Sequence, residues 1–278
     1  MSSSGAPSGT TLPELDELLA AGDGKACCAA LYEHPAVRWL LGDELHPGGE
    51  ATTQRALELI GVEAGERLLD VASGTGASAI LAAREFGCLV AGVDYGAEAV
   101  RGAQRAADAA GLCDRVGFIV GDAKALPFAD GEFDAVLCEC SLSSFPDKPR
   151  ALAEIRRVLR PGGRLALSDV VVDRHRLPKE LDGALAAFTC IGEALSPRGY
   201  EELMVEAGLR PIAVESRGED AAALAERVED RLRGARLLGL DRASGSPIAA
   251  DAAIGLAATA RQAISDGVLG YSIFAASL

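Results

Sequence analysis

The segment 70–76, with the sequence DVASGTG, joins a short apolar run to a stretch with helical spacing. A glycine-rich turn between a strand and a helix lets backbone N–H groups approach a ligand closely. About 18 residues later Asp94 ends a second apolar run, where a carboxylate can accept both hydroxyls of a ribose. The pattern predicts a site for a nucleoside-containing cofactor. Its predicted lining residues are Asp70, Ser73, Gly74 and Gly76.

Two more segments follow strand-like runs. Tyr95 comes directly after Asp94, and Gly121-Asp122-Ala123 follows the apolar run 116–120. Ligands of open α/β sheets bind outside the carboxyl ends of the strands, so we expect these segments to lie at one edge of a sheet. Asp94, with Tyr95 behind it, is predicted to hold the ribose.

The glycine spacing is shorter than the dinucleotide fingerprint G-x-G-x-x-G, because Ala79 stands at the third glycine position. The pattern resembles motif I of the class I S-adenosylmethionine-dependent methyltransferases. This resemblance implies S-adenosyl-L-methionine as the cofactor and methyl transfer as the activity. It also places Asp122 and Ala123 beside the adenine amino group.

Cysteines form a second group with chemical potential. Cys138-Glu139-Cys140 comes at the end of a fourth strand-like run, and Cys190 opens the segment CIGEAL. Residues i and i+2 of a strand point the same way, so we expect both sulfurs of the first pair to face one side of the pocket. The alternative is that they pack in the core as small apolar residues.

The sequence around these cysteines shows a second and more specific resemblance. The segment 140–148 reads CSLSSFPDK, and Pro-Gly-Gly at 161–163 and Ser168-Asp169 follow. It resembles the arsenite methyltransferases over about half of the chain, 68–208. Cys140 and Cys190 fall on the two cysteines that hold arsenic in that family. The resemblance implies a thiol-bound metalloid as methyl acceptor, with a thiol reductant as a further partner.

Trivalent arsenic is soft, so thiolate sulfur is its preferred ligand. Its lone pair can attack the methyl carbon directly, and no general base is required because arsenic loses no proton. Many arsenite methyltransferases have a further cysteine before motif I, where this chain has His46-Pro47-Gly48-Gly49. Cys138, or the pair Cys27-Cys28, could supply a third thiol.

Three other functions remain open at this point. A methyltransferase for an organic small molecule, with an oxygen, nitrogen or carbon acceptor, would need an apolar pocket and a base for an acidic proton. A cofactor-binding protein without activity would keep the same acids. A zinc site from three cysteines would need a fourth ligand, and no C-x-x-C spacing supports it, so no metal is expected.

Composition excludes several partners. The chain has 41 acidic and 27 basic residues, a formal charge of −14, and no basic run that could follow phosphates, so nucleic acid is not expected. No apolar stretch is long enough for a membrane span, and the N-terminus lacks the features of a secretion signal. With seven cysteines, an odd number, we expect a cytoplasmic protein with reduced thiols.

The order of the predicted elements indicates an α/β fold, a doubly wound, seven-stranded Rossmann-like sheet with N-terminal helices. Residues 1–11 are predicted to be disordered and 12–60 to form an N-terminal helical segment, and 61–278 to form the methyltransferase domain. A helical insertion at about 219–266 interrupts the last strand pair. Its apolar face must pack on something, either as a cap or as a homodimer surface. The predicted strands are 67–72, 89–94, 116–120, 133–138, 164–170, 211–215 and 271–276.

Overall fold

A seven-stranded sheet lies at the centre of the computed structural model, which describes residues 35–42, 46–182, 190–238 and 250–278. The strand order is β3-β2-β1-β4-β5-β7-β6, and β7 runs antiparallel to both of its neighbours. This confirms the predicted doubly wound fold. The strands are β1 (Arg67–Val71), β2 (Leu89–Asp94), β3 (Val116–Val120), β4 (Phe133–Glu139), β5 (Leu159–Val172), β6 (Arg210–Ser216) and β7 (Leu269–Ser277).

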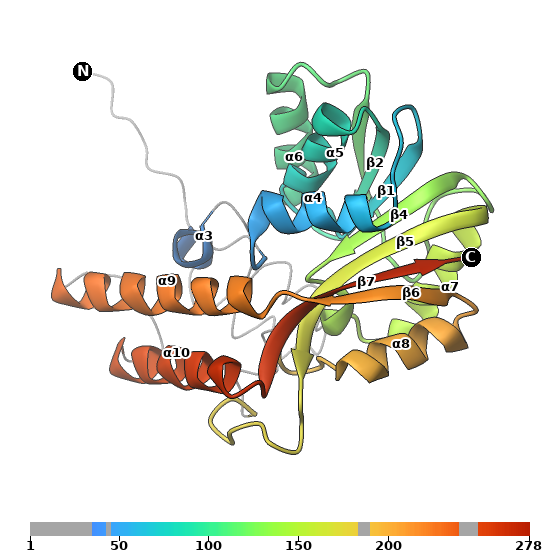
Figure 1. Cartoon of the computed structure of the whole chain (residues 1–278). Helices are drawn as coiled ribbons and strands as arrows, with labels where there is room; N and C mark the ends of the chain where they lie inside the picture. The colour runs from blue at the N-terminus through green and yellow to red at the C-terminus, as the bar shows by residue number, and fades with distance from the viewer. Residues whose placement is uncertain (1–34, 43–45, 183–189, 239–249) are drawn as a thin grey trace, which may run out of the picture.

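Helices cover both faces of the sheet (Figure 1). Adjacent residues of a strand point to opposite faces, and Leu68 and Leu69 of β1 accordingly enter two different cores. The first core lies under α4 (Gly49–Leu59), α5 (Ala77–Glu85) and α6 (Ala97–Ala109). The second lies under α7 (Lys148–Val158) and α8 (Pro197–Glu206). A short 3-10 helix, η1 (Leu142–Ser144), follows β4.

The predicted insertion between the last two strands consists of α9 (Gly218–Leu237) and α10 (Ala250–Ser265). The two helices project together beyond the end of the sheet (Figure 1). Apolar residues of α10, among them Leu256 and Ala263, pack against Val172 and Ala194 on either side of the segment that follows β5. The apolar face of α10 is therefore covered within the chain, as a cap requires, whereas Leu237 at the end of α9 is 87% exposed.

The N-terminal segment holds α9 in place from the other side. The guanidinium of Arg231 donates hydrogen bonds to the carbonyls of Trp39, at 2.6 Å, and Leu40, at 3.0 Å. Both belong to α3 (Pro35–Leu41), the part of the predicted N-terminal helices that is described. The disorder predicted for 1–11, the helices expected over 12–34, and Cys27-Cys28 lie outside the described residues.

The largest difference from the predicted strand boundaries is at the fifth strand. It was predicted over 164–170, but α7 ends at Val158 and β5 already begins at Leu159. Leu159 already pairs with Phe133 of β4, and the register shifts before Arg164. The chain therefore joins the sheet before the two glycines, and the shift in register lies within β5.

Candidate functional site

The glycine-rich loop follows β1 at the carboxyl edge of the sheet and turns into α5. It bends through three residues with positive φ, Ala72 at 61°, Gly74 at 51° and Gly76 at 80°. A Cβ at Gly76 would lie 2.6 Å from the Phe118 ring and 2.9 Å from the Ala103 methyl group. The loop thus lies so close to β3 and α6 that only glycine fits where α5 begins.

Asp94, the last residue of β2, meets this loop directly. One carboxylate oxygen accepts a hydrogen bond from the Gly74 N–H at 2.8 Å, and the other accepts one from the Gly96 N–H, also at 2.8 Å. Tyr95 beside it is 44% exposed. The predicted ribose acid and the predicted loop are therefore neighbours, although 20 residues separate them in the chain.

The end of β3 lies next to the end of β2. The Gly121 N–H donates to the Asp94 carbonyl at 2.9 Å, and Asp122 accepts a hydrogen bond from the Lys124 N–H at 2.9 Å. Ala123 packs against the second core. The three predicted cofactor segments thus come together at one edge of the sheet, as strand order requires.

Asp70, the acid at the start of the loop, is buried, with 3% of its surface exposed. Burial, followed by the charges of Glu139 and Asp94, raises the pKa of its carboxyl well above the ordinary value. One of its oxygens and the Ser73 hydroxyl are buried without a hydrogen-bond partner. A buried polar atom without a partner is costly, so these two atoms indicate a polar ligand at this place.

Glu139, the last residue of β4, forms a cluster that sequence reasoning missed. Its carboxylate is 5% exposed and accepts hydrogen bonds from Thr53 at 2.9 Å and Ser78 at 2.6 Å. The His46 ring lies 3.6 Å away. Glu139 was assigned no role from the sequence, where it stands between two cysteines. A charged residue at the end of a buried strand was the feature that could have indicated a site residue.

The thiols of Cys140 and Cys190 lie 3.7 Å apart, so the structure brings together two of the three predicted cysteines. The Cys190 thiol also donates to the Cys140 carbonyl at 3.4 Å. Hydrogen bonding to Cys190, then burial, raises the pKa of the Cys140 thiol well above its ordinary value, whereas the nearby Tyr271 hydroxyl acts in the opposite direction. The protonated form of the Cys140 thiol is therefore favoured.

Cys138 does not join this pair, contrary to the prediction. It is fully buried in the second core, its sulfur lies 3.4 Å from the Ser141 hydroxyl, and burial raises its pKa to about 12. The reason is the backbone of Cys140, whose φ of 48° ends the strand and breaks the i, i+2 alternation. Cys138 is placed as a packing residue.

Hydroxyl groups connect the thiol pair to Glu139. The Ser168 hydroxyl lies 3.3 Å from the Glu139 carboxylate and 3.0 Å from the Tyr271 hydroxyl, and the Tyr271 hydroxyl is near enough to Cys140 to lower the pKa of its thiol. Ser168, Tyr271 and Glu139 come from three neighbouring strands of one sheet face. The site therefore has a cofactor side around the loop and a second side around the thiols, joined at Glu139.

Asp169 anchors the segment that follows Cys140. It is fully buried, and its two oxygens accept hydrogen bonds from the Ser143 N–H and hydroxyl, both at 2.7 Å. Burial raises the pKa of its carboxyl to about 6 despite these donors. The bond pattern fixes η1, and with it the exit of the chain from β4.

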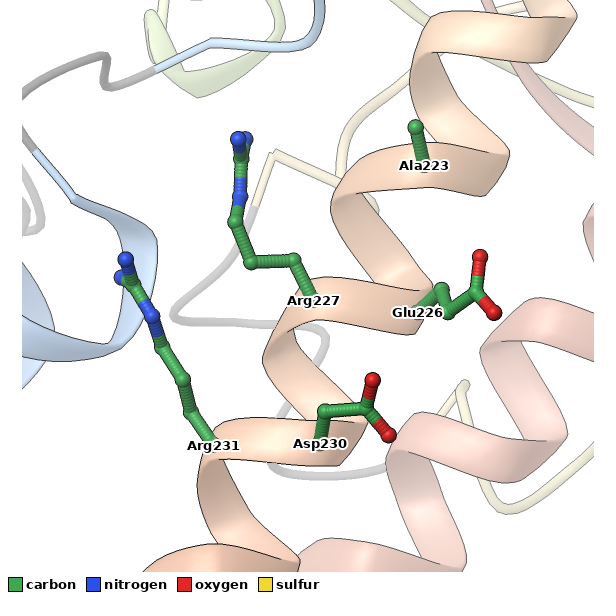
Figure 2. A pocket seen from close by; sticks show the side chains of 5 residues that line it. All are labelled: Ala223, Glu226, Arg227, Asp230 and Arg231. Atoms are coloured by element: carbon green, nitrogen blue, oxygen red, sulfur yellow. The ribbon is translucent and has the colours of Figure 1, made fainter.

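Within the described ranges, no three His, Cys, Asp or Glu side chains are grouped as metal ligands would be. A separate pocket on α9 is lined by residues of that helix alone: Ala223, Glu226, Arg227, Asp230 and Arg231. Figure 2 shows the two arginines pointing away from the two acids, which face α10. None of the predicted site residues lines this pocket. No helix in the described part of the chain is long and apolar enough to cross a membrane.

Comparison with known proteins identifies the family of the chain and, with it, the cofactor. A family model described as a methyltransferase domain matches residues 62–208, which include the loop, Asp94, Asp122 and the thiol of Cys190. The chain belongs to the S-adenosylmethionine-dependent methyltransferases. The methyltransferase is therefore an enzyme whose cofactor is S-adenosylmethionine, which supplies an electrophilic methyl group on a sulfonium.

Two relatives and one solved structure show what this methyltransferase is similar to. It is 36% identical over 170 residues to Methyltransferase GfsG of Streptomyces halstedii, spanning 60% of this chain and 61% of the relative. It is 33% identical over 218 residues to 27-O-demethylrifamycin SV methyltransferase of Amycolatopsis mediterranei, spanning 71% and 78%. A solved geranyl diphosphate methyltransferase in complex with its cofactor has a TM-score of 0.67 at 25% identity, covering 92% and 91%.

The residues present fit this cofactor. S-adenosylmethionine carries an ammonium and a sulfonium, and the loop offers a buried carboxylate oxygen and a hydroxyl that lack partners. The Asp94 carboxylate, held by two backbone N–H groups, would bind the ribose hydroxyls. Asp122 would bind the adenine amino group.

Proposed function

We propose that this methyltransferase acts on a hydroxyl group of an organic small molecule. The observation that carries the proposal is the likeness to 27-O-demethylrifamycin SV methyltransferase, which spans 78% of that protein. Its name gives an organic oxygen as its methyl acceptor. GfsG is matched over less than two thirds of its length, so it adds support for the family and not for a substrate.

The second side of the site suits such an acceptor. A hydroxyl must lose its proton as the methyl group arrives, and imidazole is the side chain most often used as a base near neutral pH. The His46 ring, 13% exposed, lies beside Glu139 in the described structure. A carboxylate next to an imidazole orients the ring and stabilises its protonated form. We assign His46 the role of proton acceptor in this proposal.

The cap formed by α9 and α10 also supports an organic acceptor. It projects beyond the end of the sheet (Figure 1), and α10 packs on Ile191 and Ala194, next to Cys190. A closed, water-poor site favours methyl transfer to a weak oxygen nucleophile over loss of the methyl group to water.

Arsenite is the second candidate acceptor, and one observation favours it. Cys140 and Cys190, which match the arsenic ligands of the arsenite methyltransferases, lie 3.7 Å apart. Arsenous acid could exchange two hydroxides for two thiolates. Each thiol proton would leave with a hydroxide as water, so the raised pKa of Cys140 does not prevent binding. Among the described residues two thiols meet here and not three, because Cys138 lies in the core.

Methyl transfer from labelled S-adenosylmethionine distinguishes the two acceptors. The wild type is offered a panel of phenols, hydroquinones and hydroxylated macrolides, and in parallel arsenite with glutathione. The variants are the double mutant C140S/C190S and H46Q. We expect labelled organic product from the wild type and the double mutant, and a loss of at least about tenfold in H46Q, since a positioned base contributes that much or more.

The opposite pattern would replace the proposal. Methylated arsenic from the wild type, absent in C140S/C190S and retained in H46Q, would establish the thiol-held acceptor. Organic product from all three proteins at equal rates would keep the substrate class and remove His46 from its role.

A further inference from the structure

We propose that Glu139 recognises the positive charge of the cofactor, so that the enzyme binds S-adenosylmethionine, a sulfonium, more tightly than S-adenosylhomocysteine, a neutral thioether. The proposal concerns the cofactor alone and holds for either acceptor. It assigns Glu139 a part in cofactor binding in addition to the predicted loop residues.

Glu139 lies between the two sides of the site. On one side it accepts hydrogen bonds from Ser78, in the first turn after the glycine-rich loop, and from Thr53 of α4. On the other it is linked through Ser168 and Tyr271 to the thiol side. The reacting methyl group must pass from one side to the other, so the sulfur that carries it would lie where the two sides meet, beside Glu139.

The charge of this region is the second argument. Three carboxylates, those of Asp70, Asp94 and Glu139, surround one loop, and the charges of the latter two both act on Asp70. Within the described ranges, the basic side chain beside these acids is His46, the proton acceptor proposed above, whose ring lies 3.6 Å from the Glu139 carboxylate. No lysine or arginine of the described residues pairs with them. Like charges at low exposure repel one another, and a bound cation relieves that repulsion.

The hydroxyl contacts of Glu139 are the third argument. Oxygen donors from three different elements, α4, α5 and β5, hold the carboxylate in one orientation at 5% exposure. A fixed, desolvated charge acts on a nearby cation more strongly than a mobile surface charge does. A positive ligand therefore offsets the free-energy cost of burying this carboxylate.

Methyl transfer changes that compensation. The bond between sulfur and the methyl carbon breaks, its electron pair stays on sulfur, and the positive charge on sulfur disappears. The product then loses its attraction to Glu139 while the ribose and adenine contacts stay the same. The carboxylate thus favours binding of the donor and release of the product.

Calorimetric titration with three known ligands tests the proposal without any acceptor. S-adenosylmethionine and sinefungin, which carries an amine in place of the sulfonium methyl, are cationic at this position, and S-adenosylhomocysteine is neutral. In E139Q we expect the affinity for the two cations to fall by about tenfold or more, as one charge pair at a partly screened site gives. The affinity for the neutral product should change by less than about threefold on the same reasoning.

Two variants serve as controls, one that keeps the charge at position 139 and one that removes a charge elsewhere. E139D keeps the charge and should keep the ratio of the two affinities, even where both decrease. E50Q removes one negative charge from an exposed position of α4, where Glu50 lies 3.6 Å from Arg84, and should change nothing. E139N is a second neutral variant, so that the ratio is measured even where E139Q does not fold.

An equal loss for S-adenosylmethionine and S-adenosylhomocysteine would overturn the proposal, because it would place Glu139 at a part that both molecules share. Unchanged affinities in a folded E139Q would overturn it as well. Neither outcome bears on the hydroxyl acceptor, which is tested by product formation alone.

Discussion

The cofactor side and the thiol side of the site are built from different kinds of sequence. The cofactor side uses three short segments, 70–76, 94–95 and 121–123, each at the end of one strand. The thiol side combines His46, Cys140, Cys190 and Tyr271, which come from distant parts of the chain. Short motifs at the ends of strands identify the first side in the sequence, whereas the residues of the second side come together only in the folded chain. Variants that affect one side and spare the other test this separation.

The largest effect is expected from G76A, on the cofactor side. A methyl group there would lie 2.6 Å from Phe118 at a φ of 80°, so we expect a loss of about 3 kcal/mol in the free energy of unfolding, from overpacking and a left-handed backbone together. Cofactor binding should fall below detection. Urea denaturation and calorimetry measure the two effects.

The matched control is G111A. Gly111 also has a positive φ, 71°, but a Cβ there meets nothing within 4 Å, so only about 1 kcal/mol of backbone strain is expected. An equal cost at both positions would show that the close approach at Gly76 is unimportant.

Next in size is D94A, which should weaken S-adenosylmethionine binding by about 100-fold, the value of two charged hydrogen bonds to the ribose. The fold should persist, because Asp94 lies at a strand end and its side chain accepts hydrogen bonds from the backbone N–H groups of Gly74 and Gly96, both in surface turns. Calorimetry of D94A is compared with D108A, an exposed acid on α6. Equal affinities would remove the ribose assignment.

A smaller, pH-dependent effect belongs to the thiol side. The pKa of Asp169 is raised to about 6 by burial, above the value near 3.9 of the unfolded chain. Protonation therefore favours the folded state. This contribution is complete below about pH 4 and is lost as the pH rises through 6, a change of about 2 kcal/mol. In D169N the urea midpoint should vary less between pH 4 and 7 than in the wild type; an unchanged slope would assign the pH dependence to another group.

The smallest effect is expected from the thiols themselves. C140S and C190S should leave the affinity for S-adenosylmethionine within about twofold of the wild type, because the described contacts of both sulfurs lie on the thiol side. C113S, at an exposed position, sets the scale of a neutral change. A tenfold loss in either site variant would show that the two sides are coupled.

Most of the fold was predictable because buried strands and amphipathic helices leave periodic patterns. β2 and β3 have the predicted boundaries, and the helical insertion lies where its composition indicated. The start of β5 was not predicted correctly, since the pairing of Leu159 with Phe133 is a tertiary contact that the apolar run 164–170 does not reveal.

The site was predictable on its cofactor side and only in part on the other. The pairing of Cys140 with Cys190 depended on a resemblance, and the position of Cys138 was wrong because one residue with positive φ reversed the expected direction. Glu139 was missed because its partners Thr53 and Ser168 lie 86 and 29 residues away. No local spacing encodes such a cluster.

The way in which the insertion joins the sheet has an evolutionary consequence. The chain leaves β6 at Ser216, which pairs with Ser272, and the Arg217 N–H donates to the Tyr271 carbonyl at 2.7 Å. The chain returns from the insertion into β7 at Leu269, close to the residues beside which it left β6, so α9 and α10 can be lengthened, exchanged or replaced by a short turn without shifting the strand register. Such a module lets a lineage change its range of substrates while inheriting an unaltered cofactor site.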